Sequence, residues 1–484
     1  MQPILTPEEM READRRAIAA GTTERELVAR AGAAVARAAV ARLGGTYGRR
    51  VTVLAGPGSN GADGIVAAGR LAALGVGADA FRIADGCEPT ALMRALDRSD
   101  LVIDAMYGTG FRDALTGPAA TAADAVAAAG LPVLAVDVPS GVDGLTGAVR
   151  GPAVRADTTV CFAALKPGLC AEPGRSHAGR VRVVDIGIDP GPVHLHAFDD
   201  ADLVLPDRAA DAHKWANAVL VVGGSPGLTG APRLAAAAAA RTGAGMVVCA
   251  VPGAEAAAAL AGGDVVTRAL PADAGMLSAD AAPALLADAE RFGALVIGPG
   301  LGRGADAATA ARALIAGFPG AVVVDADAIV ALAADPTPLR ARVAAGFPAA
   351  VLTPHGGEYA RLAGHRPGPD RVAAARTLAA RLDAIVLLKG PGTVTARPDG
   401  EALLNRTDSA DLATAGTGDV LAGIIGGLLA GDCEPFGAAA TAAHLHGLAA
   451  RRADLGPALV ASDLVAALAP TLADRRVARR SEEG

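Results

Sequence analysis

A single aspartate follows a glycine-rich turn at the start of an apolar stretch in the second half of the chain. The segment from Ala415 to Asp419 reads AGTGD, and small apolar residues continue to Ile425. Glycines let the backbone turn several N–H groups toward one point, and the start of a helix adds partial positive charge there. The pattern predicts a phosphate-binding turn with an acid or base beside it. The alternative is an ordinary turn in which Asp419 caps the helix.

Three polar loops follow apolar, strand-like runs in the first half of the chain. Residues 56–64 read GPGSNGADG, and the other two loops begin at Asp104 and Asp137. Because ligands of open parallel sheets bind beyond the carboxyl ends of the strands, we expect the three loops to share one crevice. The two aspartates, with Asn60 and Ser140, form a set of hard oxygen ligands that suits an alkali or alkaline-earth cation. Each loop by itself is also compatible with a plain turn.

The elements that must position these loops alternate along nearly the whole chain. Apolar strand-like runs are followed by alanine-rich helical stretches, a pattern that predicts the α/β class, with parallel sheets covered by helices on both faces. A segment rich in Pro, Asp and His at residues 189–211 separates two such halves, so we expect one domain at residues 1–207 and another at 208–484. The predicted strands are residues 51–55, 101–105, 133–138, 158–163, 181–186, 218–222, 246–251, 294–297, 321–325, 349–353 and 385–388.

Composition excludes several classes of protein. The 484 residues carry a net charge of −7, which argues against a surface for nucleic acid or anionic membranes. The hydrophobic fraction of 52% comes largely from alanine, and no uninterrupted apolar stretch reaches the roughly 20 residues that span a bilayer. Charged residues near the N-terminus argue against an export signal, so we expect a cytoplasmic protein. The cysteines lack the spacing of a zinc site or a disulfide framework: Cys87, Cys161, Cys170, Cys249 and Cys433.

Four long motifs resemble a known family, the bifunctional NAD(P)H-hydrate repair enzymes. They are DAMYGTG at residues 104–110, VDVPSG at 136–141, TPHGGE at 353–358 and ATAGTGDVLAG at 413–423. The first half resembles the Rossmann-like epimerase domain of the family, and the second half resembles its ADP/ATP-dependent dehydratase domain, which has a ribokinase-like fold. Together the two resemblances cover nearly the whole chain, in the order of the fused bacterial form.

For the first half, the resemblance implies interconversion of the R and S hydrates of NADH and NADPH. It implies that Asp137 is the acid/base and that Asn60, Asp104 and Ser140 hold a potassium ion. The family usually has NNGGDG where this chain has SNGADG, so Ala62 adds a Cβ where the backbone can approach a ligand closely. The residues implied to contact the substrate are Ser59, Asn60, Gly61, Ala62, Asp63, Gly108, Thr109, Gly110, Phe111, Arg112, Asp113, Ala114 and Asp137.

For the second half, the resemblance implies dehydration of the S hydrate, driven by ADP or ATP with Mg²⁺. Asp419 would take the proton of the hydroxyl group while the amides of residues 415–418 stabilise the transferring phosphate. Two residues of this half also allow a structural interpretation, His355 as an ordinary loop histidine and Lys389 as an ordinary exposed lysine. Glu358 is interpreted as a negative charge that complements a helix dipole, and it is left out of the site. The hydrate would contact Ala231, Gly300 or Gly302, His355 and Asp419, and the nucleotide would contact Lys389, Gly390, Pro391, Gly392, Thr393 and Gly418.

A rival hypothesis is a ribokinase-like small-molecule kinase whose N-terminal half is a non-catalytic binding domain, because the GTGD turn also serves such kinases. The attached first half and TPHGGE favour the repair enzyme. The expected partners are therefore the hydrates and ADP or ATP, without nucleic acid or membrane. Glycine-rich α/β enzymes often associate, which favours a homo-oligomer.

Overall fold

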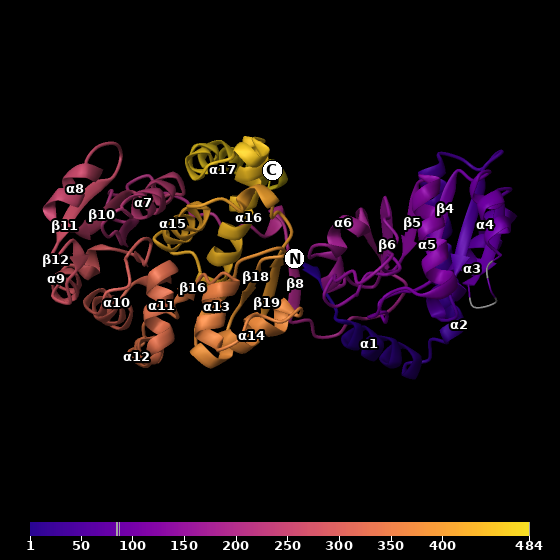
Figure 1. Cartoon of the computed structure of the whole chain (residues 1–484), viewed down its shortest axis with the longest axis horizontal. Coiled ribbons are helices and arrows are strands. Elements are labelled where there is room, and N and C mark those ends of the chain that lie inside the picture. The colour runs from indigo at the N-terminus through magenta and orange to yellow at the C-terminus, as the bar shows by residue number, and fades with distance from the viewer. Residues whose placement is uncertain (84–85, 87, 484) are drawn as a thin grey trace. The chain divides into compact units, whose positions relative to one another are not determined.

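The computed structural model describes residues 1–83, 86 and 88–483, and these form two compact units. One unit is Gln2–Ala197, and the other consists of Met1 and the chain from Phe198 onward (Figure 1). Cys87 lies outside the described residues, and side chains are described as far as residue 477.

The N-terminal unit contains a parallel sheet in the order β3-β2-β4-β5-β6-β7 (Figure 1). The predicted strands of this half are confirmed, with ends that differ by a few residues. β3 was not predicted because it is an edge strand whose half-exposed residues form no apolar run. The strands are β2 (Arg50–Ala55), β3 (Gly77–Arg82), β4 (Leu101–Ala105), β5 (Val133–Val136), β6 (Thr158–Phe162) and β7 (Arg180–Val184). Outside this sheet, β1 (Gln2–Pro3) pairs antiparallel with β8 (Leu195–Phe198).

Helices cover both faces of this sheet, as the alternation predicted. One apolar core lies between the sheet and α1, α2 and α3, and a second lies between the other face and α4 and α5. Because α3 follows β2 closely, its first turn lies at the carboxyl end of the sheet, where the loops after β4 and β5 also begin. The helices are α1 (Pro7–Ala19), α2 (Glu24–Leu43), α3 (Ser59–Ala73), α4 (Pro89–Leu96), α5 (Gly117–Ala129) and α6 (Gly174–Ala178).

The sheet of the C-terminal unit runs in the order β19-β18-β17-β16-β15-β14-β9-β10-β11. It is parallel from β17 to β11, whereas β18 and β19 are antiparallel additions that the sequence did not predict. The strands are β9 (Ala218–Val222), β10 (Met246–Pro252), β11 (Val266–Leu270), β14 (Ala294–Ile297), β15 (Ala321–Val324), β16 (Val351–Leu352), β17 (Ile385–Leu388), β18 (Val394–Ala396) and β19 (Ala402–Asn405), beside the small hairpin of β12 (Ala272–Asp273) and β13 (Met276–Leu277).

Helices again lie on both faces of the sheet, with α7, α15, α16 and α17 sharing one core and α10 to α14 on the opposite side (Figure 1). The helices are α7 (Gly230–Arg241), α8 (Ala254–Leu260), α9 (Ala281–Leu286), α10 (Ala305–Gly317), α11 (Ala326–Ala334), α12 (Thr337–Ala344), α13 (Gly356–Ala363), α14 (Arg371–Leu382), α15 (Thr417–Leu429), α16 (Pro435–Ala453) and α17 (Ala461–Glu483).

Glycines within α15 let this helix pack closely against its neighbours. A Cβ added at Gly423 would lie 2.1 Å from the carbonyl oxygen of Ala235 in α7, and one added at Gly426 would lie 2.4 Å from the side chain of Val296 in β14. The helix interior therefore tolerates glycine, which usually costs about 1 kcal/mol relative to alanine, because a larger residue would force the helix away. This packing fixes the position of the turn that precedes α15.

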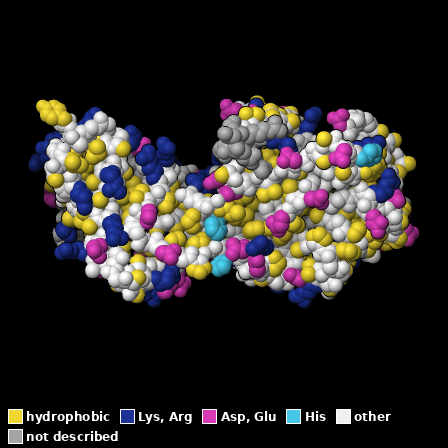
Figure 2. Space-filling view, turned by 180° about the vertical axis from the view of Figure 1, so that it is seen from behind, with side chains coloured by type: hydrophobic (Ala, Val, Ile, Leu, Met, Phe, Trp, Pro, Cys, Tyr) yellow, Lys and Arg dark blue, Asp and Glu magenta, His cyan; other side chains and the backbone are white. Residues whose placement is uncertain are grey.

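Basic and acidic side chains are interspersed over the face of the molecule in Figure 2. Within the described part of the chain, no helix combines the length and the apolar character that crossing a bilayer requires.

Candidate active sites

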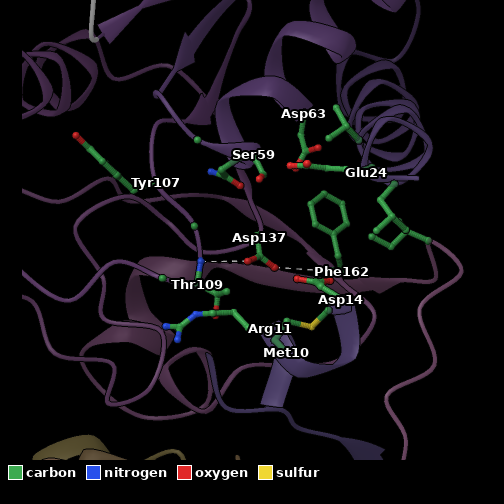
Figure 3. A pocket seen from close by; sticks show the side chains of 18 of the residues that line it. Met10, Arg11, Asp14, Glu24, Ser59, Asp63, Tyr107, Thr109, Asp137 and Phe162 are labelled. Atoms are coloured by element: carbon green, nitrogen blue, oxygen red, sulfur yellow. Dashed lines mark hydrogen bonds between the residues drawn. The ribbon is translucent and has the colours of Figure 1, made fainter. Parts of the chain in front are cut away.

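A cavity of about 570 Å³ opens at the carboxyl end of the N-terminal sheet (Figure 3). It is lined by the start of α3, by the loops after β4, β5 and β6, and by α1 and α2. The apolar lining includes Met10 on α1, Leu27 on α2 and Phe162 at the end of β6, and the ionisable lining includes Asp14 on α1 and Asp137 after β5. An apolar cavity that holds a few polar groups is the usual character of a small-molecule site.

Asp137 lies in this cavity and is held from three directions. Its backbone has φ +65°, a left-handed conformation that aspartate tolerates and that turns the chain away from β5. Its Oδ1 lies 2.7 Å from Nζ of Lys166, and its Oδ2 accepts a hydrogen bond of 3.2 Å from the backbone of Thr109 (Figure 3 draws the latter). A weaker contact of 3.4 Å comes from the backbone of Phe162. The lysine therefore places a positive charge directly against Asp137.

Lys166 is buried and saturated with acceptors. Besides Asp137, its ammonium group donates to the carbonyl oxygens of Phe162 at 2.8 Å and Ala164 at 3.2 Å. Burial alone would lower the pKa of Lys166, but the charge of Asp137 outweighs it and raises the pKa to about 12. Lys166 thus acts as a fixed positive charge rather than as a group that exchanges protons at neutral pH.

Asp104 and Ser140, two of the predicted cation ligands, are brought together beneath the cavity. The hydroxyl group of Ser140 donates to Oδ1 of Asp104 at 2.6 Å, and its backbone N–H donates to Oδ2 at 2.8 Å. Asp104 is fully buried, and burial raises the pKa of its carboxyl group to about 6 although hydrogen bonds from Ser140 and Met106 oppose the rise. Among the described residues, the ion pairs include none to Asp104, so a bound cation would compensate the cost of its buried charge.

Asn60, the third predicted ligand, lies on the first turn of α3 and lines the cavity. Its Nδ2 is buried and has no hydrogen-bond partner among the described residues. Rotation of the amide would present the oxygen in place of this nitrogen, and the two orientations are distinguished only by their partners. A carboxylate, a hydroxyl and an amide oxygen fit the hard ligands of an alkali cation.

The remaining predicted substrate contacts of this unit divide into two groups. Ser59, Asp63 and the loop residues 108–111 line the cavity. The other predicted contacts, at residues 61, 62 and 112–114, do not belong to its lining. Ala62 is exposed, so its Cβ points away from the cavity, whereas a Cβ at Gly61 would lie 1.9 Å from the carbonyl oxygen of Gly56. The two backbone segments therefore approach each other closely at Gly61, and this chain retains that glycine.

In the C-terminal unit, Asp419 occupies the first turn of α15, directly after the glycine turn. Gly416 has φ +88°, a conformation that glycine adopts without strain and that directs the following amides toward the helix start. Burial raises the pKa of Asp419 to about 7; the charges of Asp325, Glu358 and Asp327 add to the rise and that of Lys389 opposes it. A carboxylate with a pKa near neutrality is suited to general-base catalysis.

Lys389 follows β17 and lies at the centre of this group of charges. Its Nζ is 2.9 Å from Oδ1 of Asp325 and 3.9 Å from Oε2 of Glu358. Burial lowers the pKa of Lys389, but these two carboxylates outweigh it and raise the pKa overall. A Cβ added at Gly418 would lie 3.2 Å from this Nζ, so the ammonium group touches the glycine turn itself. The lysine is therefore placed to contact an anion bound at the turn.

His355 and Glu358 begin α13 as a capping pair. Nδ1 of His355 accepts hydrogen bonds from the amides of Gly357 at 2.9 Å and Glu358 at 3.3 Å, and the carboxylate of Glu358 accepts one from the amide of His355 at 2.9 Å. The interpretation of Glu358 as a group at a helix start agrees with this arrangement. Its second contact, with Lys389, also places it among the charges around Asp419.

Ala231, Gly300 and Gly302 lie where β9 and β14 end. A Cβ at Gly300 would lie 2.4 Å from a carbonyl oxygen in the turn before α7 and 3.2 Å from Cβ of Ala231, so the two predicted contacts are neighbours. The amide of Gly302 donates to Asp327 at 3.0 Å, and Ser225 donates to the carbonyl of Gly300 at 2.9 Å. Both glycines adopt left-handed φ angles, of +61° and +81°, that their tight turn requires.

Sequence reasoning missed three residues that the structure places beside the predicted groups: Lys166, Asp325 and Asp327. A signal existed for each. Lys166 interrupts an apolar stretch, FAALKPG, directly after a strand, and a lysine in such a setting is rarely buried without a partner. Asp325 and Asp327 follow the strand AVVV, at the end where the other site residues also lie.

Comparisons with known proteins match both halves of the chain to families. A family described as NAD(P)H-hydrate dehydratase matches residues 219–470, and one described as YjeF-related protein N-terminus matches residues 24–92 and 82–168. The bifunctional NAD(P)H-hydrate repair enzyme Nnr of Moorella thermoacetica is 39% identical over 460 residues, which cover 86% of each chain. The enzyme of the same name from Salinibacter ruber is 37% identical, covering 98% of this chain and 96% of its own.

Among solved structures, the hypothetical protein SMU.573 from Streptococcus mutans is similar to this chain with a TM-score of 0.50 and 24% identity. The match covers 58% of this chain and 99% of that protein. This likeness concerns the fold alone.

Proposed function

The chain belongs to the family of bifunctional NAD(P)H-hydrate repair enzymes, and from this premise we propose how its two sites divide the repair between them. The enzyme interconverts the R and S hydrates of NADH and NADPH and dehydrates the S form back to the reduced dinucleotide. We assign the first reaction to a domain at residues 1–207 and the second to a domain at residues 208–484. The observation that carries the assignment is the pair of ionisable sites, one in each unit.

In the epimerase site, Asp137 is the proposed acid/base. Epimerisation inverts a ring carbon that bears both a hydroxyl group and the ring nitrogen. This inversion requires reversible proton transfer to and from the groups on that carbon. Its place in the cavity and its contact of 2.7 Å with Lys166 support this role, because the carboxyl group is held where it can accept the hydroxyl proton. Asn60, Asp104 and Ser140 are the proposed potassium ligands; the ion would neutralise the buried carboxylate and hold the ends of two loops together.

In the dehydratase site, Asp419 is the proposed base. Hydroxide is a poor leaving group, so the hydroxyl oxygen gives its proton to Asp419 and takes the terminal phosphoryl group of ADP or ATP. The carbon–oxygen bond then breaks with its electron pair leaving as phosphate, and loss of a proton from the adjacent ring carbon restores the double bond. The amides of residues 415–418 and the ammonium group of Lys389 would stabilise the charge that develops on the phosphoryl group.

The other ligand contacts remain those that the resemblance implied. The nucleotide, bound with Mg²⁺, would contact residues 389–393 and Gly418, and the hydrate would contact Ala231, Gly300 or Gly302, and His355. In the epimerase cavity the hydrate would contact Ser59, Asn60, Asp63 and residues 108–111, which are the predicted contacts that line it. We also propose that the enzyme acts in the cytoplasm and assembles as a homo-oligomer.

A spectrophotometric assay tests whether the chain carries out both epimerisation and nucleotide-dependent dehydration. Purified R and S hydrates are offered separately to the full chain, with and without ADP or ATP and Mg²⁺. Without nucleotide, we expect each epimer to convert into a mixture and no reduced nicotinamide to form. With nucleotide, we expect both epimers to regain the absorbance of reduced nicotinamide, with one inorganic phosphate released per molecule. A stable phosphorylated product without recovered absorbance would favour the small-molecule kinase instead.

A further inference from the structure

Asp63 is a second carboxyl group that faces the epimerase cavity from a different element than Asp137. It lies on α3, is 7% exposed, and belongs to the same lining as Asp137 and Lys166. Figure 3 shows the side chains of Asp63 and Asp137 entering the cavity from different parts of the unit. A substrate ring bound in the cavity therefore lies within one compartment that holds two carboxyl groups.

The surroundings of the two carboxyl groups differ in charge. A lysine is bonded to Asp137, whereas the ion pairs of the described residues include none to Asp63. Burial, followed by the charges of Asp137 and Asp14, raises the pKa of Asp63 to about 8. Asp63 is thus mostly protonated at neutral pH, whereas the carboxyl group of Asp137 lies against the ammonium group of Lys166. The charged residues that line the cavity around Asp63 are Arg11 and Asp14 on α1, Glu24 on α2, Asp137 after β5 and Lys166 after β6.

Helix packing explains why Asp63 is buried from solvent. At Gly32, α2 crosses α3 so closely that an added Cβ would lie 2.8 Å from the carbonyl oxygen of Asp63 and 2.5 Å from the side chain of Val66. The crossing covers the turn of α3 that carries Asp63 and leaves its carboxyl group facing the cavity. Desolvation in such a place disfavours the charged form of a carboxylate.

We propose that Asp63 is a second catalytic residue of the epimerisation, the acid that protonates the ring nitrogen while Asp137 accepts the hydroxyl proton. The inference rests on the proposed function of this cavity. Reversible opening of a hemiaminal ring requires one group that accepts the hydroxyl proton and another that donates a proton to the nitrogen, and this cavity holds two carboxyl groups. Asp137 alone supplies a base and leaves the departing nitrogen without a proton.

The reaction balances without a further reactant. Asp137 takes the hydroxyl proton as the carbon–nitrogen bond breaks, and the electron pair of that bond goes to the nitrogen, which receives the proton of Asp63. The open form carries an aldehyde and an N–H group. After rotation about the adjacent carbon–carbon bond, the nitrogen attacks the opposite face of the aldehyde carbon and returns its proton to Asp63, while the oxygen regains its proton from Asp137. Nothing is oxidised or reduced, and both carboxyl groups return to their first state.

The test measures recovery of the pure R hydrate by the full chain in the presence of nucleotide and Mg²⁺. For Asp63→Asn, we expect recovery to fall by about 10² to 10⁴, toward the spontaneous rate, because an amide cannot transfer the proton. Asp63→Glu should regain part of the rate. Asp124→Asn, at an exposed position on α5, is the matched control and should leave the rate unchanged. Recovery of the S hydrate, which needs only the other site, should stay constant in every variant.

A second measurement remains decisive even if Asp63→Asn misfolds. In the wild-type protein, kcat/KM for the R hydrate should fall about tenfold per pH unit above pH 8, where Asp63 loses its proton. The proposal is overturned if Asp63→Asn epimerises within about tenfold of the wild type, or if no alkaline decline occurs between pH 7 and 9. If the wild-type protein fails to recover the R hydrate at all, it is the epimerase half of the proposed function that is wrong.

Discussion

In the N-terminal unit a lysine is bonded to the aspartate that we propose as acid/base, whereas in the C-terminal unit the lysine is bonded to an aspartate beside the proposed base. The two contacts are similar in length, 2.7 Å for Lys166 with Asp137 and 2.9 Å for Lys389 with Asp325. Their surroundings differ: the side chain of Lys166 is 1% exposed and that of Lys389 is 19% exposed. The first lysine is enclosed by carbonyl oxygens, and the second touches a glycine turn that is open to a ligand.

The difference corresponds to the chemistry proposed for each site. Proton transfer needs no cation that reaches the substrate. Lys166 is buried and its donors are saturated, so it provides a constant positive charge beside Asp137 and does not itself exchange protons. Phosphoryl transfer needs positive charge that can reach a bound anion, so its lysine must keep one side free of protein. In this scheme Lys166 supports the proposed acid/base of one unit, whereas Lys389 contacts the proposed ligand of the other.

The largest expected effect concerns the C-terminal site. Asp419→Asn should lower recovery of the S hydrate by about 10⁴, because the hydroxyl group loses its base before phosphoryl transfer. Recovery of the R hydrate falls equally, since its path ends at the same site, while R and S still interconvert. Absorbance and chromatography of the hydrates measure the two outcomes. Asp306→Asn, exposed on α10, is the matched control; an Asp419→Asn enzyme with a normal rate would remove Asp419 from the chemistry.

The corresponding change in the N-terminal site should have a narrower effect. Asp137→Asn should lower recovery of the R hydrate by about 10² to 10³ and leave the S hydrate fully recoverable, because only the epimerisation loses its base. Both rates are measured by the absorbance of reduced nicotinamide, with slow spontaneous epimerisation as the floor. Full recovery of both epimers would show that the two sites do not divide the repair as proposed.

Removing the two lysines sharpens the comparison in terms of stability. Lys166→Met leaves the carboxylate of Asp137 without its buried partner and should lower the free energy of unfolding of this unit by about 3–5 kcal/mol. Lys389→Met should cost less stability, because the lysine itself is more exposed than Lys166 and Asp325 keeps a hydrogen bond of 2.6 Å from Thr353. Denaturant unfolding of the two variants measures the difference. Equal losses would contradict the idea that one lysine is enclosed and the other serves a ligand.

Several of these residues could be found from the sequence because their signals are local. The glycine turn before Asp419 and the aspartates at the carboxyl ends of β4 and β5 can be recognised from their motifs and from the apolar strands beside them. Lys166 and Asp325 each follow a strand, but their partners could not be predicted, because an ion pair between residues 29 or 64 positions apart depends on which loops the fold brings together. Asp63 was predicted to contact the substrate, but its burial depends on the crossing at Gly32, which is a property of tertiary packing.

The elements show the same limit. Strands buried on both faces, such as β14, produce continuous apolar runs that the sequence reveals. The edge strands β3 and β11 carry exposed and charged residues, so their strand character arises from pairing with β2 and β10 and leaves little trace in composition.

The charges around Asp419 predict a specific pH dependence of dehydration. Asp419 must be ionised to accept a proton, and its pKa is raised to about 7, so the rate should fall about tenfold per pH unit below pH 7. Because the charge of Asp325 contributes to that rise, Asp325→Asn should move the decline to lower pH. Asp327 contributes least of the carboxylates named, so Asp327→Asn should move it less. Rates of S-hydrate recovery between pH 5 and 9 test the order, and a shift to higher pH in Asp325→Asn would contradict it.

The smallest expected effect concerns Ala62, where the chain departs from the glycine usual in its family. Ala62 is exposed on α3 and does not line the cavity, so Ala62→Gly should change the KM for the R hydrate by less than about twofold and lower stability by about 0.5–1 kcal/mol through the greater freedom of glycine in a helix. The neighbouring position provides the contrast, because a Cβ at Gly61 would lie 1.9 Å from a backbone oxygen. Gly61→Ala should therefore displace α3 from the end of β2 and weaken epimerisation strongly, while the nucleotide-dependent site of the other unit keeps its rate. If Ala62→Gly instead improved KM many-fold and Gly61→Ala had no effect, the close approach of substrate and backbone would belong to position 62, and the cavity described here would be bounded differently.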